Sequence, residues 1–142
     1  MWIWWRRLAK HGHAVGASFT VEWSHDSDLH RLKSVAKFMA QYGMVRRKVA
    51  GCVFGLKSIA GRTRGLPLCK AWGIWTSSKS LALALSGPEV CCQGGHVSTP
   101  VSGVDTAHSG TYTDQMARYV IKSLCTPVDV VTRAMGSGKW SL

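Results

Sequence analysis

Apolar residues recur at helical spacing between residues 29 and 42. Residues three and four apart lie on the same face of a helix, so such a stripe predicts an amphipathic helix. Polar and basic residues fall on the opposite face. Ser27 or Asp28 can cap the start, and Gly43 can end the helix. The apolar positions are Leu29, Leu32, Val35, Ala36, Met39 and Tyr42.

Three other segments have the composition of strands, because they are rich in β-branched and aromatic residues. These strand candidates are residues 17–23, 46–56 and 68–76. Helical patterns also occur in residues 1–11, 78–85 and 113–124. The second and third strand candidates flank a polar segment, and we expect them to pair as a hairpin.

Helices and strands therefore alternate along the chain, which is typical of α/β proteins. We expect a small, partial Rossmann-like unit of three layers, with a short sheet of about three strands flanked by helices. The expected domain covers residues 1–125. Residues 87–110 are rich in Gly, Ser, Thr and Pro and predict a long irregular segment, either functional or poorly ordered. Residues 126–142 include Gly136-Ser-Gly138 and predict a flexible tail.

Charge is distributed unevenly in this chain, which has a formal net charge of +11. Between Leu29 and Pro88 there are eleven Lys or Arg residues and no Asp or Glu. Positive charges without acids between them attract polyanions and repel one another in a compact state. A surface of mixed charges gives solubility without that repulsion. The pattern favours DNA or RNA bound without sequence preference; an acidic membrane surface and a plain solvated surface are the alternatives. The bases are Arg31, Lys33, Lys37, Arg46, Arg47, Lys48, Lys57, Arg62, Arg64, Lys70 and Lys79.

Composition excludes several classes of protein. Hydrophobic residues make up 46% and charged residues 18%, which is typical of globular rather than disordered chains. No apolar run approaches the roughly 20 residues that a transmembrane helix needs. The chain has five cysteines, an odd number, and its first segment is unlike a secretory signal. Both observations predict reduced thiols. We therefore expect an intracellular location, cytoplasmic or nuclear.

The polar segment 58–67 carries the strongest candidates for phosphate contact. Gly61 and Gly65 enclose Arg62 and Arg64 in a short basic loop. The loop is not a phosphate-binding P-loop, because it lacks the Gly-Lys-Ser/Thr ending before a helix. The predicted nucleic-acid-binding residues are Lys57, Arg62, Arg64 and Lys70.

The stretch Cys91-Cys92-Gln-Gly-Gly-His96 contains two residue types that bind zinc, and Cys92 and His96 have a feasible ligand spacing. A structural zinc site needs four ligands, and Cys91 and His108 complete such a set only if the chain folds back. Adjacent cysteines rarely chelate one ion. We therefore expect thiols without metal, with a zinc-stabilised binding module centred on Cys92 and His96 as the alternative.

Three stretches resemble a known arrangement: Val21-Glu22-Trp23, residues 50–58 and residues 65–72. They are similar to methyltransferase-like domains encoded by retroelements and related genes of protists and marine animals. Those domains in turn resemble the latter half of DNA cytosine-5 methyltransferases. The similarity spans roughly residues 17–125.

The resemblance implies roles for particular residues. In that fold a strand ends in Glu-Asn-Val, whose Glu contacts the flipped cytosine, and a later loop carries Gln-x-Arg-x-Arg. By this resemblance Glu22 is the base-pocket carboxylate, Arg62 and Arg64 lie in the corresponding loop, and Lys70 and Trp72 match a Lys-Pro-Trp element. Without the resemblance, Glu22 is a strand-end acid that faces either a ligand crevice or solvent.

The chain also departs from this family. Ser24 and Ala50 stand where the retroelement group has Pro and Asp. The Pro-Cys turn that supplies the nucleophilic thiolate, and the glycine-rich loop for S-adenosylmethionine, would lie upstream of Met1. The resemblance therefore implies a nucleic-acid-binding fragment that is catalytically inactive alone and has no cofactor of its own unless such motifs exist upstream. A degenerate reading frame without activity is a further alternative.

Overall fold

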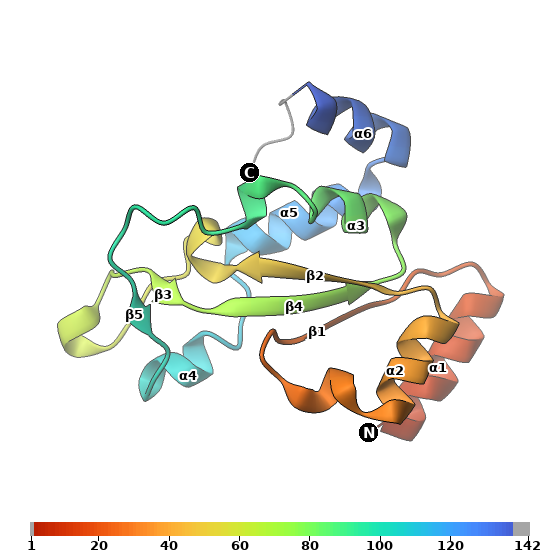
Figure 1. Cartoon of the computed structure of the whole chain (residues 1–142), viewed down its shortest axis with the longest axis horizontal. Helices are drawn as coiled ribbons and strands as arrows, with labels where there is room; N and C mark the ends of the chain where they lie inside the picture. Colours follow the sequence, from red (N-terminus) through yellow and green to blue (C-terminus); the bar gives the residue numbers. More distant parts are fainter. Residues whose placement is uncertain (1, 138–142) are drawn as a thin grey trace.

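A computed structural model describes residues 2–137 of the chain. Its centre is a three-stranded sheet in which β4 lies between β1 and β2, and both neighbours run antiparallel to β4 (Figure 1). The strands are β1 (Thr20–Ser24), β2 (Val45–Ala50) and β4 (Ala71–Thr76). In a second, smaller sheet, β3 (Leu68–Cys69) runs parallel to β5 (Thr99–Pro100).

Helices cover both faces of the central sheet (Figure 1). On one side lie α1 (Trp2–Ala14) and α2 (Lys33–Gln41). On the other lie α3 (Lys79–Ala84), α5 (Asp114–Cys125) and α6 (Val128–Gly136), while the short α4 (Val104–His108) lies next to the small sheet. Short 3-10 helices span Asp28–Arg31, Gly51–Phe54, Gly61–Thr63 and Pro88–Val90. None of the helices within residues 2–137 is both long and apolar enough to cross a bilayer.

The core is divided into two clusters by β4, because side chains alternate between the two faces of a strand. Trp72 and Ile74 are buried in the larger cluster, together with residues of α3, α5 and α6. Trp75 faces the opposite way and packs against the smaller cluster with residues of α1 and α2. The fully buried members of the larger cluster include Val49, Phe54, Leu56, Leu68, Leu81, Val90, Met116 and Val131.

The structure confirms a small α/β unit with a three-stranded sheet flanked by helices. It also confirms that the second and third predicted strands pair antiparallel, although residues 51–70 connect them and no tight hairpin turn does. Neighbouring strands of a Rossmann sheet are parallel, and both neighbouring pairs of this described sheet are antiparallel, so the Rossmann-like character is not confirmed. Glu22 correspondingly lies in the middle of an antiparallel edge strand and not at the carboxyl end of a parallel one.

Glycines with positive φ follow α2 and the 3-10 turn after β2. The helix expected over 29–42 forms in two pieces: a 3-10 turn capped by the Ser27 hydroxyl, then α2, which is followed by Gly43 with φ of 58°. The strand expected over 46–56 ends at Ala50, where the chain turns into a 3-10 helix. Gly55 closes that turn in the left-handed region, with φ of 73°.

The segment 126–142, expected as a flexible tail, contains a helix in the structure. Residues 128–136 form α6, which places Val131 in the larger core, with Ala134 and Met135 packed against the same cluster. Their spacing of three and four residues forms one apolar helix face, and this outweighs the glycines that suggested mobility. Residues 138–142 lie outside the described part of the chain.

We expect Val131→Ala to lower the free energy of unfolding by about 1–2 kcal/mol, because it removes two buried methyl groups and leaves a cavity. Val130→Ala is the matched control, since Val130 is the preceding residue of the same helix and is exposed. Urea unfolding of both variants measures the difference. Equal stability of the two would mean that α6 is not docked on the core.

Candidate functional site

Two segments far apart in sequence bring three metal-ligating side chains together. Cys52 lies in the 3-10 turn that follows β2, and Cys92 and His96 lie in the irregular segment after α3. One ligand atom from each residue lies within 4.8 Å of the other two. Cys92 Sγ and His96 Nε2 are 3.8 Å apart. The structure therefore unites the predicted pair Cys92 and His96 with Cys52, and not with Cys91 or His108.

Local backbone geometry explains how this cluster forms. Gly94 and Gly95 both have positive φ, 78° and 79°, and such a pair lets the chain reverse between Cys92 and His96. The Gln93 side chain donates a hydrogen bond of 2.8 Å to the Pro88 carbonyl, which fixes the start of this turn. On the other side, the Gly51 N–H donates to the Lys70 carbonyl at 2.8 Å and fixes the turn that carries Cys52.

The cluster opens on a cavity of about 240 Å³ with a mixed lining. Two basic residues, Lys48 and Lys70, and one acidic residue, Asp26, are among those that line it. Burial, with a smaller contribution from Cys92, raises the pKa of the Cys52 thiol to about 11. In the absence of a metal ion this thiol is therefore protonated at neutral pH.

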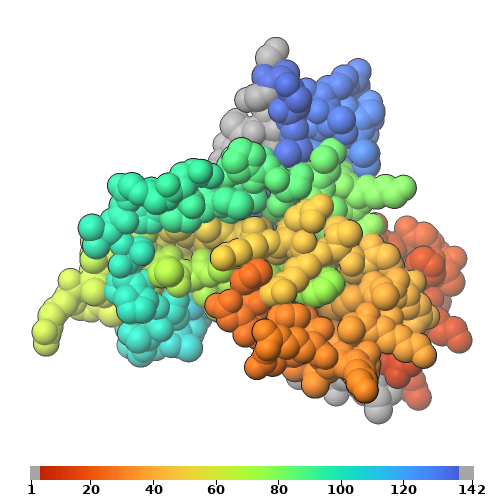
Figure 2. Space-filling view, viewed as in Figure 1, coloured from red at the N-terminus to blue at the C-terminus, as the bar shows by residue number. Residues whose placement is uncertain are grey.

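The basic loop lies apart from this cluster. Lys57, Arg62 and Arg64 are exposed in residues 57–66, which project from the body of the molecule at the left of Figure 2. Lys70 is half-buried and lies between β3 and β4 in the wall of the Cys52 cavity. The four predicted nucleic-acid-binding residues therefore divide into three on the loop and one beside the cysteines.

A buried carboxylate that the sequence did not single out fixes the base of this loop. Asp105 is 2% exposed, accepts a hydrogen bond from the Ser58 hydroxyl at 2.7 Å and another from the Ile59 N–H at 2.8 Å. The hydrogen bond from Ser58 is the largest cause that lowers the pKa of Asp105 from its ordinary value. The only hint in the sequence is that Asp105 is the one acid between Glu89 and Asp114.

Glu22 is half-buried on β1, on the sheet face that also carries Trp72. Burial raises the pKa of Glu22, while the charge of Lys70 opposes the shift. Burial also raises the pKa of the Tyr112 phenol, and the negative charge of Glu22 adds to that shift. The Tyr112 ring packs edge-on against Trp72, with ring centroids 5.4 Å apart. Glu22 therefore lies near a lysine and a tyrosine, and no ion pair joins it to Arg62 or Arg64 within residues 2–137.

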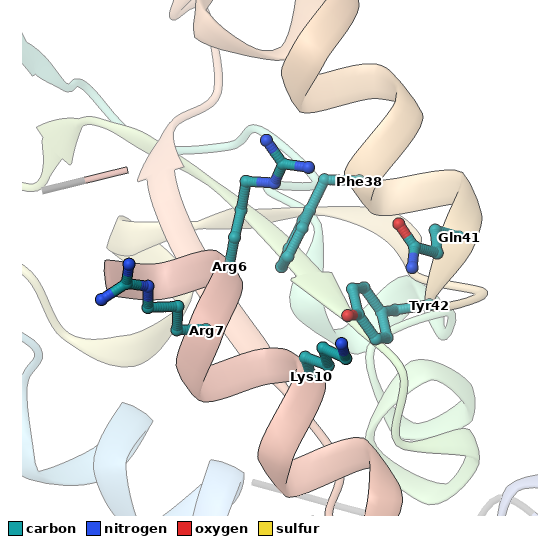
Figure 3. Close-up of a pocket in the computed structure, with 6 residues that line it drawn as sticks. All are labelled: Arg6, Arg7, Lys10, Phe38, Gln41 and Tyr42. Atoms are coloured by element: carbon teal, nitrogen blue, oxygen red, sulfur yellow. The ribbon is translucent and has the colours of Figure 1, made fainter. Parts of the chain in front are cut away.

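A second basic cavity, of about 270 Å³, lies between α1 and α2. Figure 3 shows Arg6 beside the Phe38 ring and Lys10 pointing toward Tyr42, whereas Arg7 points away from α2. The Arg7 guanidinium instead lies over the Trp4 ring, 5.3 Å from its centroid. Guanidinium and ammonium groups next to aromatic rings are a common surface for nucleic acids. The sequence missed this site because its residues come from two helices that only the fold brings together.

Comparisons with known proteins assign no family. No family model, no curated protein and no solved structure matches this chain. The resemblance to methyltransferase-like domains therefore stays a prediction.

The pH dependence of stability tests the role of Asp105. The pKa of Asp105 is lower in the folded chain than its unfolded value of about 3.9. Its contribution to the free energy of unfolding is therefore complete above about pH 3.9 and is lost as the pH falls through the folded pKa. We expect Asp105→Asn to lower the melting temperature at pH 7, because the amide cannot accept both hydrogen bonds. The difference from the unmodified chain should shrink as the pH falls below about 4.

Asp129→Asn is the control for this experiment, because Asp129 forms an exposed ion pair with Arg133. Such pairs contribute little to stability. Thermal unfolding followed by circular dichroism across this pH range measures all three chains. If Asp105→Asn melts at the same temperature as the unmodified chain at pH 7, Asp105 does not hold the loop.

Proposed function

We propose that this chain binds nucleic acid through its basic surface, with little sequence preference. The observation that carries the proposal is the acid-free block between Leu29 and Pro88, with its eleven bases. In the described part of the chain, Arg31 is the one base of this block that forms an ion pair, with Asp28 at 3.2 Å. Unpaired cations on one chain favour a polyanionic partner, whose counterions they release.

Not all of these bases are available to a partner. Arg46 donates to the carbonyl of His25 and lies 5.9 Å from the centroid of the Trp75 ring, and Arg47 donates to the Ala82 carbonyl at 3.0 Å. Both are half-buried. These two arginines stabilise the fold, so the proposal rests on the exposed bases that form no ion pair within residues 2–137: Lys33, Lys37, Lys48, Lys57, Arg62, Arg64 and Lys79.

The loop of Arg62 and Arg64 is the strongest single contact candidate. Its base is fixed by Asp105, while its tip carries two exposed guanidinium groups bounded by Gly61 and Gly65. A fixed loop loses little conformational entropy when it meets phosphates. The Arg-x-Arg spacing is also the one that the methyltransferase resemblance implies for a DNA-contacting loop, so we propose the same role here. The same resemblance implies that Glu22 contacts a flipped base.

Binding to a short duplex DNA should weaken steeply as salt rises, because each neutralised phosphate releases about 0.9 counterion. Fluorescence anisotropy with labelled duplexes of two unrelated sequences measures the affinity over a range of salt concentrations. We expect similar affinities for both sequences and a linear fall of log affinity with log salt. Absence of binding at low salt, or salt-dependent binding to anionic vesicles and not to DNA, would contradict the proposal.

Arg62→Ala combined with Arg64→Ala should reduce the slope of log affinity against log salt by roughly 2, since two phosphate contacts are lost. The melting temperature should stay nearly constant, because exposed substitutions change stability by no more than about 0.5 kcal/mol. The control removes the same charge elsewhere: Arg118→Ala with Arg133→Ala, both exposed on α5 and α6. An equal loss of slope in the control would show that net charge, and not this loop, determines binding.

A further inference from the structure

The three side chains Cys52, Cys92 and His96 form the one group in the described chain that combines soft ligands at metal-binding distance. We propose that these residues form a binding site for a zinc ion, with two thiolates and one imidazole as protein ligands. The three ligands are not among the bases proposed to contact nucleic acid, so each proposal can fail without the other.

The distances between ligand atoms fit a tetrahedral ion. With bonds of about 2.3 Å to sulfur and about 2.05 Å to nitrogen, two ligands of a tetrahedral zinc lie roughly 3.6 Å apart. Cys92 Sγ and His96 Nε2 are separated by 3.8 Å, and the Cys52 sulfur lies within 4.8 Å of both. The separation of Cys92 and His96 is therefore close to the tetrahedral value, and the separations from Cys52 exceed it by no more than about 1.2 Å.

The two halves of the site differ in rigidity. Cys52 belongs to a turn that hydrogen bonds fix at both ends, through Gly51 to Lys70 and through Gly55 back to Cys52. Cys92 and His96 are exposed on a loop shaped by two glycines. An ion bound between them would therefore fasten the exposed loop to the end of β2.

The ligand chemistry favours zinc over other common divalent ions. Thiolate and imidazole ligands are typical of zinc, whereas magnesium and calcium take oxygen ligands. Two thiolates also neutralise the charge of the ion. The zinc site therefore has no net positive charge that would repel Lys48 and Lys70, which line the same cavity. Three protein ligands leave a fourth position, where a water molecule can bind.

The test uses the full chain, purified under reducing conditions and freed of metal with a chelator. Competition with a chromophoric chelator measures the affinity and stoichiometry of zinc, and cobalt substitution reports the ligands. We expect one zinc per chain and a cobalt spectrum with a thiolate charge-transfer band and tetrahedral d–d bands. Cys92→Ser and His96→Ala should each weaken zinc binding by at least about tenfold, since loss of an outer-shell partner alone costs that much.

Neighbouring residues supply the matched control. Cys91→Ser changes the adjacent exposed cysteine, which is outside the cluster, and should bind zinc like the unmodified chain. If Cys52→Ser fails to fold, the variants at the exposed positions 92 and 96 still decide the question. Absence of stoichiometric zinc binding in the reduced chain, or equal weakening by Cys91→Ser and Cys92→Ser, would overturn the proposal.

Discussion

The pairing of β4 on both of its edges is the interaction on which the rest of the fold depends. β1 and β2 come from different parts of the chain, and each is held in register only through this central strand. Its side chains divide the core, with Trp72 and Ile74 on one face and Trp75 on the other. At Gly73 an added Cβ would lie 3.2 Å from the His25 Cα, so the chain that leaves β1 packs closely over the strand. Both helical layers are therefore positioned by one buried strand.

Cys52 and the basic loop lie in the long connection between β2 and β4. Residues 51–70 contain Cys52 and the exposed basic loop, and residues 87–110 pack along this connection at three points. Cys92 and His96 meet Cys52, β5 pairs with β3, and Asp105 accepts hydrogen bonds from Ser58 and Ile59. The segment that composition marked as irregular is thus the part that orders the basic loop. The buried Asp105 carboxylate binds the Ser58 hydroxyl and the Ile59 N–H, and not the arginines of the loop. One acid can therefore hold the basic loop in a defined position without neutralising its charge.

The sequence predicted those features that depend on local pattern. Helical spacing located α2 and α5, strand composition located the three strands, and the acid-free block located the exposed bases. It could not predict contacts between distant segments: Cys52 joins Cys92 across 40 residues, and Asp105 joins Ser58 across 47. The strand order also escaped prediction, because alternating helices and strands are compatible with both parallel and antiparallel sheets. The packing of Val131 in the larger core was likewise not predicted, because Gly136 and Gly138 favour a flexible tail.

The most direct test of this account is the melting temperature of the chain with and without a short duplex DNA at low salt. The exposed bases repel one another in the free chain, and a bound polyanion both removes that repulsion and stabilises the folded state by mass action. We expect the DNA to raise the melting temperature at about 0.1 M salt and to have no effect at about 1 M, where the screening length falls from about 10 Å to about 3 Å. A melting temperature that DNA does not change at low salt, or changes equally at both salt concentrations, would contradict the account.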